Sequence, residues 1–210
     1  MNYAEIKKCD VANGPGVRVS LFVSGCTHHC KECFNKETWD FQFGKPFTQD
    51  TINEILELLS PDYIKGITLL GGEPMEQVNQ QGLLPLLRQI REKLPDKTVW
   101  CFTGYDYEKD VLARMVPEWE ETKEFLSYLD VLVDGEFKIE QKDLGLIFKG
   151  SANQRTILVQ ESLREGHIYT GIPKIHKNLI KFYEIPKKCQ KRLEILGQVR
   201  YNNEWVVTAR

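Results

Sequence analysis

The sequence predicts an α/β protein built as an incomplete, open parallel β/α barrel. Strand-like segments alternate with amphipathic helical segments through about the first 160 residues, which is the pattern of a parallel sheet with crossover helices. Four of the predicted strands also end in unusual loops, and the strand ends of such sheets share one edge, where ligands bind. A closed eightfold barrel usually needs ~200–250 residues, so four or five strands within this length indicate an incomplete barrel.

Segments rich in β-branched and aromatic residues are the predicted strands. Four cover residues 17–23, 66–70, 98–103 and 131–133, and residues 155–159 are a candidate fifth. The first runs directly into a cysteine-rich loop. The next three end on short polar or glycine-containing loops, which are Gly71-Gly72-Glu73-Pro74, Gly104-Tyr105 and Asp134-Gly135-Glu136-Phe137.

Three helices are predicted between these strands. The first two, about 48–59 and a helix that ends at Pro95, carry apolar residues at helical spacing on one face. These residues are Ile52, Ile55, Leu56 and Leu59 in the first, and Leu83, Leu87, Ile90 and Leu94 in the second. A third helical stretch covers roughly residues 118–129.

Composition narrows the class of protein. The 210 residues are 41% hydrophobic and 28% charged, which is ordinary for a soluble globular protein, and they favour one main domain. The net charge of −2 gives no reason to expect nucleic-acid binding. No apolar run is long enough to cross a membrane, and the first eight residues lack the apolar core of a signal peptide. A cysteine cluster in such a chain indicates a reducing cytoplasm.

The end of the chain differs in composition from the rest. It contains Ile172-Pro173, Ile185-Pro186 and several lysines. We expect residues 1–162 to form the barrel and residues 163–210 to form a small C-terminal extension. Residues 198–207 resemble a β-hairpin with a turn at Asn202-Asn203.

Three of the six cysteines, Cys26, Cys30 and Cys33, stand in one loop with the spacing C-x3-C-x2-C. Three thiols cannot all pair as disulfides, whereas three thiolates suit an iron–sulfur cluster whose fourth iron has no cysteine. A structural zinc site that includes His28 or His29 is the alternative, although such sites more often use paired C-x2-C elements. Cys101 lies in a strand that ends near this loop and stays open as a fourth ligand.

Gly71, Gly72 and Glu73 form the second candidate element. Glycines let a ligand approach the backbone closely, and a glutamate at a strand end accepts charge-assisted hydrogen bonds from a bound cation. The alternative is that these residues form a turn without a binding role, since glycines followed by proline are common in turns.

Together these elements resemble the radical S-adenosylmethionine superfamily, and more narrowly the glycyl-radical activating enzymes. Within these, the chain most resembles the activating subunits of anaerobic ribonucleoside-triphosphate reductase, over about residues 6–160. The resemblance is carried by the three cysteines, by Gly71-Gly72-Glu73, and by the sequences at residues 13–18, 21–26, 33–39, 131–137 and 148–155.

The resemblance implies a radical S-adenosylmethionine fold and a specific chemistry. Cys26, Cys30 and Cys33 would hold three irons of a 4Fe–4S cluster, and the fourth iron would bind the amino and carboxylate groups of S-adenosylmethionine. Gly71, Gly72 and Glu73 would orient the methionyl amine. Asn153 and Arg155 would contact the ribose or the carboxylate.

The implied reaction is reductive cleavage of S-adenosylmethionine to a 5′-deoxyadenosyl radical, which then creates a glycyl radical on the large subunit of anaerobic ribonucleoside-triphosphate reductase. A flavodoxin-type protein would donate the electron. The alternatives are activation of another glycyl radical enzyme, action on a small molecule as in carboxy-deazaguanine synthases, and a zinc-stabilised adaptor without catalysis.

Several smaller expectations accompany this hypothesis. Many superfamily members carry an aromatic residue before the third cysteine, near the adenine, where this chain has Glu32. We expect Asn13 and Arg18 to brace the cysteine loop, Asp134 to cap a turn, and Phe34 and Tyr105 to be packing residues. His28 and His29 are expected to be solvated.

Overall fold

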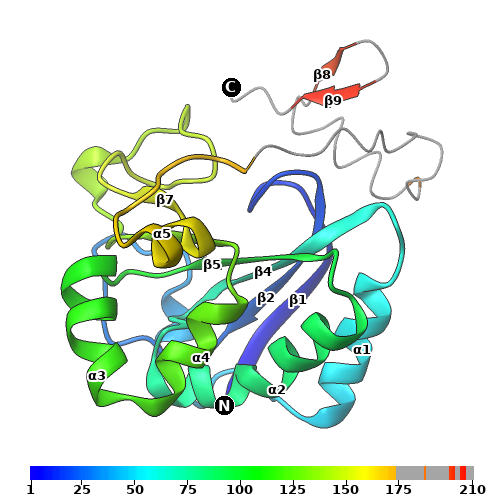
Figure 1. Ribbon diagram of the computed structural model, residues 1–210, viewed down its shortest axis with the longest axis horizontal. Coiled ribbons are helices and arrows are strands. Elements are labelled where there is room, and N and C mark those ends of the chain that lie inside the picture. The colour runs from blue at the N-terminus through cyan, green and yellow to red at the C-terminus, as the bar shows by residue number, and fades with distance from the viewer. Residues whose placement is uncertain (174–186, 188–198, 202–203, 207–210) are drawn as a thin grey trace.

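Seven strands form one mixed sheet in the computed structural model, which describes residues 1–173, 187, 199–201 and 204–206 (Figure 1). The strand order is β3-β1-β2-β4-β5-β6-β7. Their bounds are β1 Asn2–Asp10, β2 Val17–Val23, β3 Lys45–Pro46, β4 Ile64–Gly71, β5 Thr98–Phe102, β6 Val131–Asp134 and β7 Arg155–Leu158.

Only the middle of the sheet is parallel. β2, β4, β5 and β6 pair in parallel, as predicted, whereas β1, β3 and β7 pair antiparallel with their neighbours. The expectation that residues 155–159 would continue a parallel sheet is therefore wrong. The connection from β6 to β7 contains no crossover helix, only the 3-10 turn Ile139–Gln141, so the chain turns back from the edge at which β6 ends.

Helices cover one face of the sheet. Figure 1 shows α1 (Gln49–Leu59), α2 (Gln77–Lys93) and α4 (Glu120–Tyr128) on the same side, and they correspond to the three predicted helices. The sequence did not predict the remaining helical elements. Besides the 3-10 turn Ile139–Gln141, these are the 3-10 turn Lys36–Trp39, the π-helix Tyr107–Met115, α3 (Val116–Glu118) and α5 (Val159–Glu165).

Side chains on the two faces of the strands enter different clusters. Val19, Leu21 and Val23 of β2 join the large core beneath the helices. Trp100, Val131 and Val133 project to the other face, where Phe148 covers them. Burial on both faces explains why the parallel strands are continuous apolar runs rather than alternating ones.

Arg18 is structural, but it does not brace the cysteine loop as expected. It stands at the start of β2, and its guanidinium donates to Thr68 Oγ1 at 2.8 Å and to the carbonyl oxygens of Ile67 and Thr98. Burial lowers the pKa of Arg18 to about 9. Arg18 therefore ties β4 and β5 together at the end of the parallel strands opposite to the cysteine loop.

Gly66 permits the close approach of β4 and β5. Its φ is +157°, and a Cβ built there would lie 1.9 Å from the carbonyl oxygen of Thr98.

We expect Gly66→Ala to lower the free energy of unfolding by about 3 kcal/mol, measured by urea denaturation, because the two strands must separate. Gly171→Ala is the control, since Gly171 has a φ of +155° and nothing within 4 Å of its Cβ position. Equal losses would show that backbone strain, not strand packing, sets the cost.

At the chain end, β8 (Val199–Tyr201) and β9 (Glu204–Val206) pair antiparallel with Val199 opposite Val206. The predicted turn at Asn202-Asn203 lies outside the described residues. The proposed boundary between residues 162 and 163 stays a prediction.

Candidate functional site

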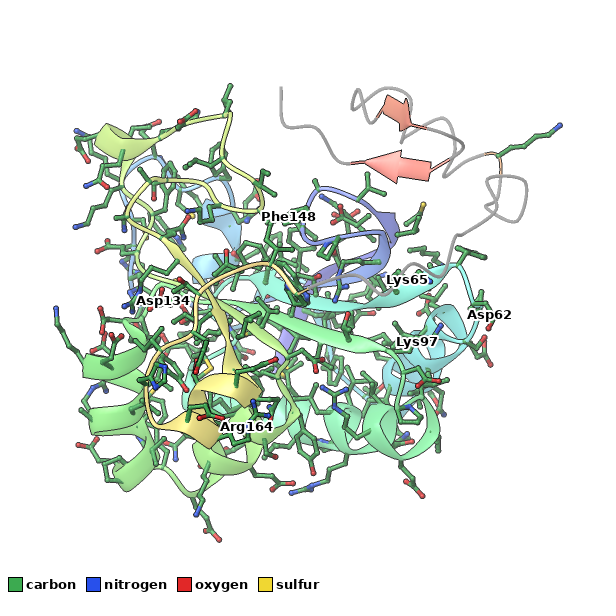
Figure 2. The ribbon with its side chains drawn as sticks, turned by 45° about the horizontal axis from the view of Figure 1, so that its top comes forward. Asp62, Lys65, Lys97, Asp134, Phe148 and Arg164 are labelled. Carbon is green, nitrogen blue, oxygen red and sulfur yellow. The ribbon has the colours of Figure 1, made fainter. Side chains whose placement is uncertain are left out.

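The carboxyl ends of β2, β4, β5 and β6 surround one cavity. In Figure 2, Asp134 at the end of β6 marks this edge of the sheet, and Lys65 and Lys97 mark the opposite edge. The cavity is lined by side chains or backbone of Cys26, Cys30, Cys33, Gly71, Gly72 and Glu73. The structure thus brings together the cysteine loop and the glycine-rich loop that the sequence singled out.

Backbone hydrogen bonds join these two loops directly. The Gly72 N–H donates to the carbonyl of Val23, and the Glu73 N–H donates to that of Gly25, each at 2.8 Å. A Cβ on Gly72 would lie 2.6 Å from the Gly25 oxygen, so only glycine fits this approach. On its other side, the Gly25 N–H donates to the carbonyl of Thr38 at 2.8 Å. The start of the cysteine loop is therefore held from two directions.

A buried amide on α2 reinforces this junction. The Asn79 Nδ2 donates to the carbonyl oxygens of Glu73 at 2.9 Å and Ser24 at 3.1 Å, and more weakly to that of Gly25 at 3.4 Å. Asn79 is fully buried. One side chain thus connects the ends of β2 and β4 where the two loops begin, and the sequence had not marked it.

Glu73 is buried and its carboxylate already accepts several hydrogen bonds. Its Oε1 accepts from the Met75 N–H at 2.8 Å, and its Oε2 accepts from the Gly104 N–H at 2.7 Å. The His28 Nε2 lies 3.1 Å from the same Oε2. Glu73 is therefore fixed in orientation by three chain segments, which suits a group that must present an oxygen to a ligand.

His28 is not the solvated residue that we expected. Its side chain is 15% exposed, and its ring lies 4.3 Å from that of Tyr105. Burial opposes the charged imidazole, but the hydrogen bond and charge of Glu73 prevail and raise the pKa of His28. His29 is exposed, as expected, and stacks on Trp39.

A second carboxylate steadies the cysteine loop near its start. Glu76 Oε1 accepts from the Thr27 N–H at 3.0 Å and from its hydroxyl at 2.6 Å. The Tyr105 hydroxyl donates to the same oxygen at 3.2 Å. Thr27 is thus anchored on Glu76 at the start of α2, and His28 lies against Glu73 of the glycine-rich loop. Tyr105 also packs against the core, as expected.

The thiols fit a cluster better than a single zinc ion. Burial raises the pKa of Cys26 to about 12 and that of Cys30 to about 11, so a bound cation must drive off their protons. Sulfurs around one tetrahedral zinc lie only ~3.7 Å apart, because each Zn–S bond is ~2.3 Å. Within the described residues, however, no group of three potential ligand atoms lying within 4.8 Å of one another includes a cysteine. The three cysteine sulfurs are therefore not all within 4.8 Å of one another, and this spacing is compatible with a centre that contains several metal ions.

Cys101 does not complete this set. Its side chain is fully buried in the core beneath the helices, and it does not line the cavity. Its thiol donates to the carbonyl of Phe102 at 3.8 Å. Three cysteines, not four, therefore face the cavity in the described part of the chain.

Comparison with known proteins decides the family. Residues 12–157 match the model of the 4Fe-4S single cluster domain. The chain is 41% identical over 159 residues to the anaerobic ribonucleoside-triphosphate reductase-activating protein of Pasteurella multocida, covering 73% of this chain and 95% of the relative. The proteins of the same name from Vibrio cholerae and Escherichia coli K12 are 43% and 40% identical over 156 residues, covering 73% of this chain and 96% of each relative.

The chain belongs to this activating-protein family. It also belongs to the 4Fe-4S single cluster domain family, whose match includes all three cysteines of the loop and the glycine-rich loop. No helix among the described residues is long and apolar enough to cross a membrane.

Not every residue expected at the activating-protein site lines the cavity. The Arg155 guanidinium donates to Asp134 Oδ1 at 3.1 Å and to Glu108 Oε1 at 3.0 Å, and Asn153 Nδ2 donates to the carbonyl of Glu136 at 2.9 Å. Gln154 between them does line the cavity, and sequence reasoning missed it.

Asp134 caps the start of a helix rather than a turn, because its Oδ2 accepts from the Tyr107 N–H at 3.0 Å where the π-helix begins. Glu32 has a left-handed backbone with a φ of +58° and is not among the residues that line the cavity.

Proposed function

We propose that this chain is a radical S-adenosylmethionine enzyme that generates a glycyl radical on anaerobic ribonucleoside-triphosphate reductase. The observation that carries the proposal is the junction of the three-cysteine loop with Gly71-Gly72-Glu73 around one cavity. The names of the relatives, which are about 40% identical over nearly their whole length, support the choice of partner.

Each part of the cavity has a role in this proposal. Cys26, Cys30 and Cys33 would hold three irons of a 4Fe–4S cluster, and the iron without a cysteine would be free to bind the amino and carboxylate groups of S-adenosylmethionine. Glu73, with the Gly71 and Gly72 backbone, would orient the methionyl amine, because its buried carboxylate is held by hydrogen bonds and lines the same cavity as the three cysteines. When bound, the cluster would pass one electron from an external donor to S-adenosylmethionine, whose C–S bond then breaks to give methionine and a 5′-deoxyadenosyl radical that takes a hydrogen atom from the glycine Cα.

Asn153 and Arg155 stay proposed contacts with the ribose or carboxylate. Arg155 donates hydrogen bonds to Glu108 and Asp134. To contact the cofactor, its guanidinium must give up its hydrogen bond to one of these carboxylates. Its planar donor fork suits a carboxylate.

The finer features of fold and setting belong to the same proposal. Four parallel strands with antiparallel strands at both edges form an open sheet, which we interpret as an incomplete β/α barrel of radical S-adenosylmethionine type. An open side admits a loop of another protein to the cavity. We further propose a flavodoxin-type electron donor, a cytoplasmic location, no role for nucleic acid or a membrane, and a separate extension at residues 163–210.

The test is anaerobic. The cluster is reconstituted with iron and sulfide, dithionite and S-adenosylmethionine are added, and 5′-deoxyadenosine is measured by chromatography. Purified reductase is then added, and the glycyl radical is measured by electron paramagnetic resonance. Cleavage without a radical on the reductase would contradict the partner but keep the chemistry. Zinc without iron or sulfide in anaerobically purified native protein would overturn both.

A further inference from the structure

Phe34 is the most exposed aromatic side chain beside the cavity, and it is not the packing residue that the sequence indicated. It follows Cys33, is 67% exposed and belongs to neither apolar cluster of the described residues. Its ring centroid lies 5.3 Å from that of Phe137, and Lys142 Nζ lies 5.0 Å from its centroid. Phe34 and Phe137 both line the cavity, and Phe34 is also exposed, so the pair extends from the cavity to the protein surface.

The connection that faces Phe34 presents further apolar side chains outward. Residues 135–154 bury Phe148 against Trp100, with ring centroids 5.5 Å apart, and this contact anchors the connection on the sheet. Phe137 lies against Gly150, where a Cβ would come within 3.1 Å of its ring. Beyond Lys142, however, Leu144 is 79% exposed and Ile147 is 40% exposed. Contiguous exposed apolar surface beside a site can mark a binding surface, and both residues belong to the connection that contacts Phe34.

We propose that Phe34, Phe137 and Leu144, here called the rim surface, bind the segment of the reductase that carries the reactive glycine. This inference rests on the proposed function. A glycine has no side chain by which it can be held, so its position must be set by its neighbours along the chain. An apolar residue beside the glycine packs on Phe34 and Phe137, and the glycine Cα then enters the cavity next to the cysteine loop.

The position of the rim surface supports this occupant rather than another. Hydrogen-atom transfer needs van der Waals contact between the glycine Cα–H and the reacting carbon, so the segment must pass the cavity mouth. The rim surface is continuous with that mouth, because two of its three members also line the cavity. Leu144 is assigned to the surface because it is exposed and stands two residues after Lys142, whose Nζ lies 5.0 Å from the Phe34 ring centroid. A second copy of this chain is the competing occupant.

The experiment uses the reconstituted full-length enzyme, S-adenosylmethionine and intact reductase under anaerobic conditions. Phe34→Ala and Leu144→Asp are compared with Leu163→Asp, a control on α5 that is 45% exposed and does not line the cavity. We expect both rim variants to bind the reductase at least ~10-fold more weakly, since an aromatic or apolar anchor typically contributes that much. Leu144→Asp should still form 5′-deoxyadenosine at the wild-type rate without reductase, and the control should bind normally.

Three outcomes overturn the inference while leaving the proposed function standing. They are wild-type binding by both rim variants, an equal loss in Leu163→Asp, and a change in the enzyme's own oligomeric state, which would assign the surface to a second copy. If the wild-type enzyme cleaves S-adenosylmethionine but neither binds nor activates the reductase, the proposed partner fails, and this inference fails with it.

Discussion

Replacing Cys30 with alanine should abolish the formation of 5′-deoxyadenosine, whereas replacing Cys101 with alanine should leave it intact. Cys30 lines the cavity together with Cys26 and Cys33, and two thiolates cannot hold the three irons that the loop is proposed to bind. Cys101 is fully buried in the core beneath the helices and does not line the cavity. The iron content of the reconstituted Cys30→Ala variant should therefore fall from about four per chain to well below that number.

The Cys101 variant makes this comparison specific. Removing a buried thiol costs about 1 kcal/mol of folding free energy, so a modest loss of stability is expected without loss of the cluster. Iron and sulfide are measured on both variants after identical reconstitution, with visible absorption as a second readout. A full cluster in Cys30→Ala, or an empty site in Cys101→Ala, would replace the assigned ligand set by one that contains Cys101.

The sequence predicted the site better than the sheet around it. The ends of β2, β4, β5 and β6 meet because consecutive parallel strands end at one edge, and this rule needs only the order of strands and helices. The strands themselves were visible because both of their faces are buried, which makes residues such as Val19 and Leu21 part of unbroken apolar runs.

The strands that escaped correct prediction depend on information that lies outside them. β1 is half-exposed along most of its length and mixes lysines with apolar residues, so neither a run nor a clean alternation marks it. The direction of β7 is set by the preceding connection, where Phe148 anchors the chain on the sheet without a crossover helix. Residues 155–158 alone contain no signal for direction.

The supporting residues of the site were equally invisible. Gln154 and Asn79 are amides in segments where polar residues are ordinary, and their importance comes from carbonyl groups that are distant in sequence. Asn79 reaches Ser24, 55 positions earlier in the chain. The prediction for His28 was wrong for the same reason, since its ring lies beside the carboxylate of Glu73, which follows the end of another strand.

Asn79→Leu should loosen the cluster and weaken the binding of S-adenosylmethionine, because Asn79 connects the two loops that form the cavity. The change keeps the side-chain volume roughly constant but leaves the buried carbonyls of Ser24 and Glu73 without this donor. The Glu73 carbonyl keeps its hydrogen bond from the Glu76 N–H at 3.2 Å, but the Ser24 carbonyl loses its donor. An unsatisfied buried carbonyl costs about 1–3 kcal/mol, and the protein can recover that cost by moving the two loops apart. We expect the Michaelis constant for S-adenosylmethionine to rise by at least ~10-fold, since small displacements of positioning groups have effects of this size. Loss of iron to a chelator should be faster than in the wild type.

Gln80→Leu separates this role from simple stability. Gln80 is the next residue on α2, is also fully buried, and donates through Nε2 to the carbonyl of Met75 at 2.8 Å. In the described part of the chain, Gln80 Oε1 and Asn79 Oδ1 also share the lack of a hydrogen-bond partner, so the two substitutions remove similar groups from similar surroundings. Only the Asn79 amide reaches the start of the cysteine loop. If both variants lose thermal stability but only Asn79→Leu releases iron faster and binds S-adenosylmethionine more weakly, the amide positions the loops. Equal iron release in the two variants would reduce Asn79 to an ordinary core residue, and the backbone bonds of Gly72 and Glu73 would then suffice to hold the junction.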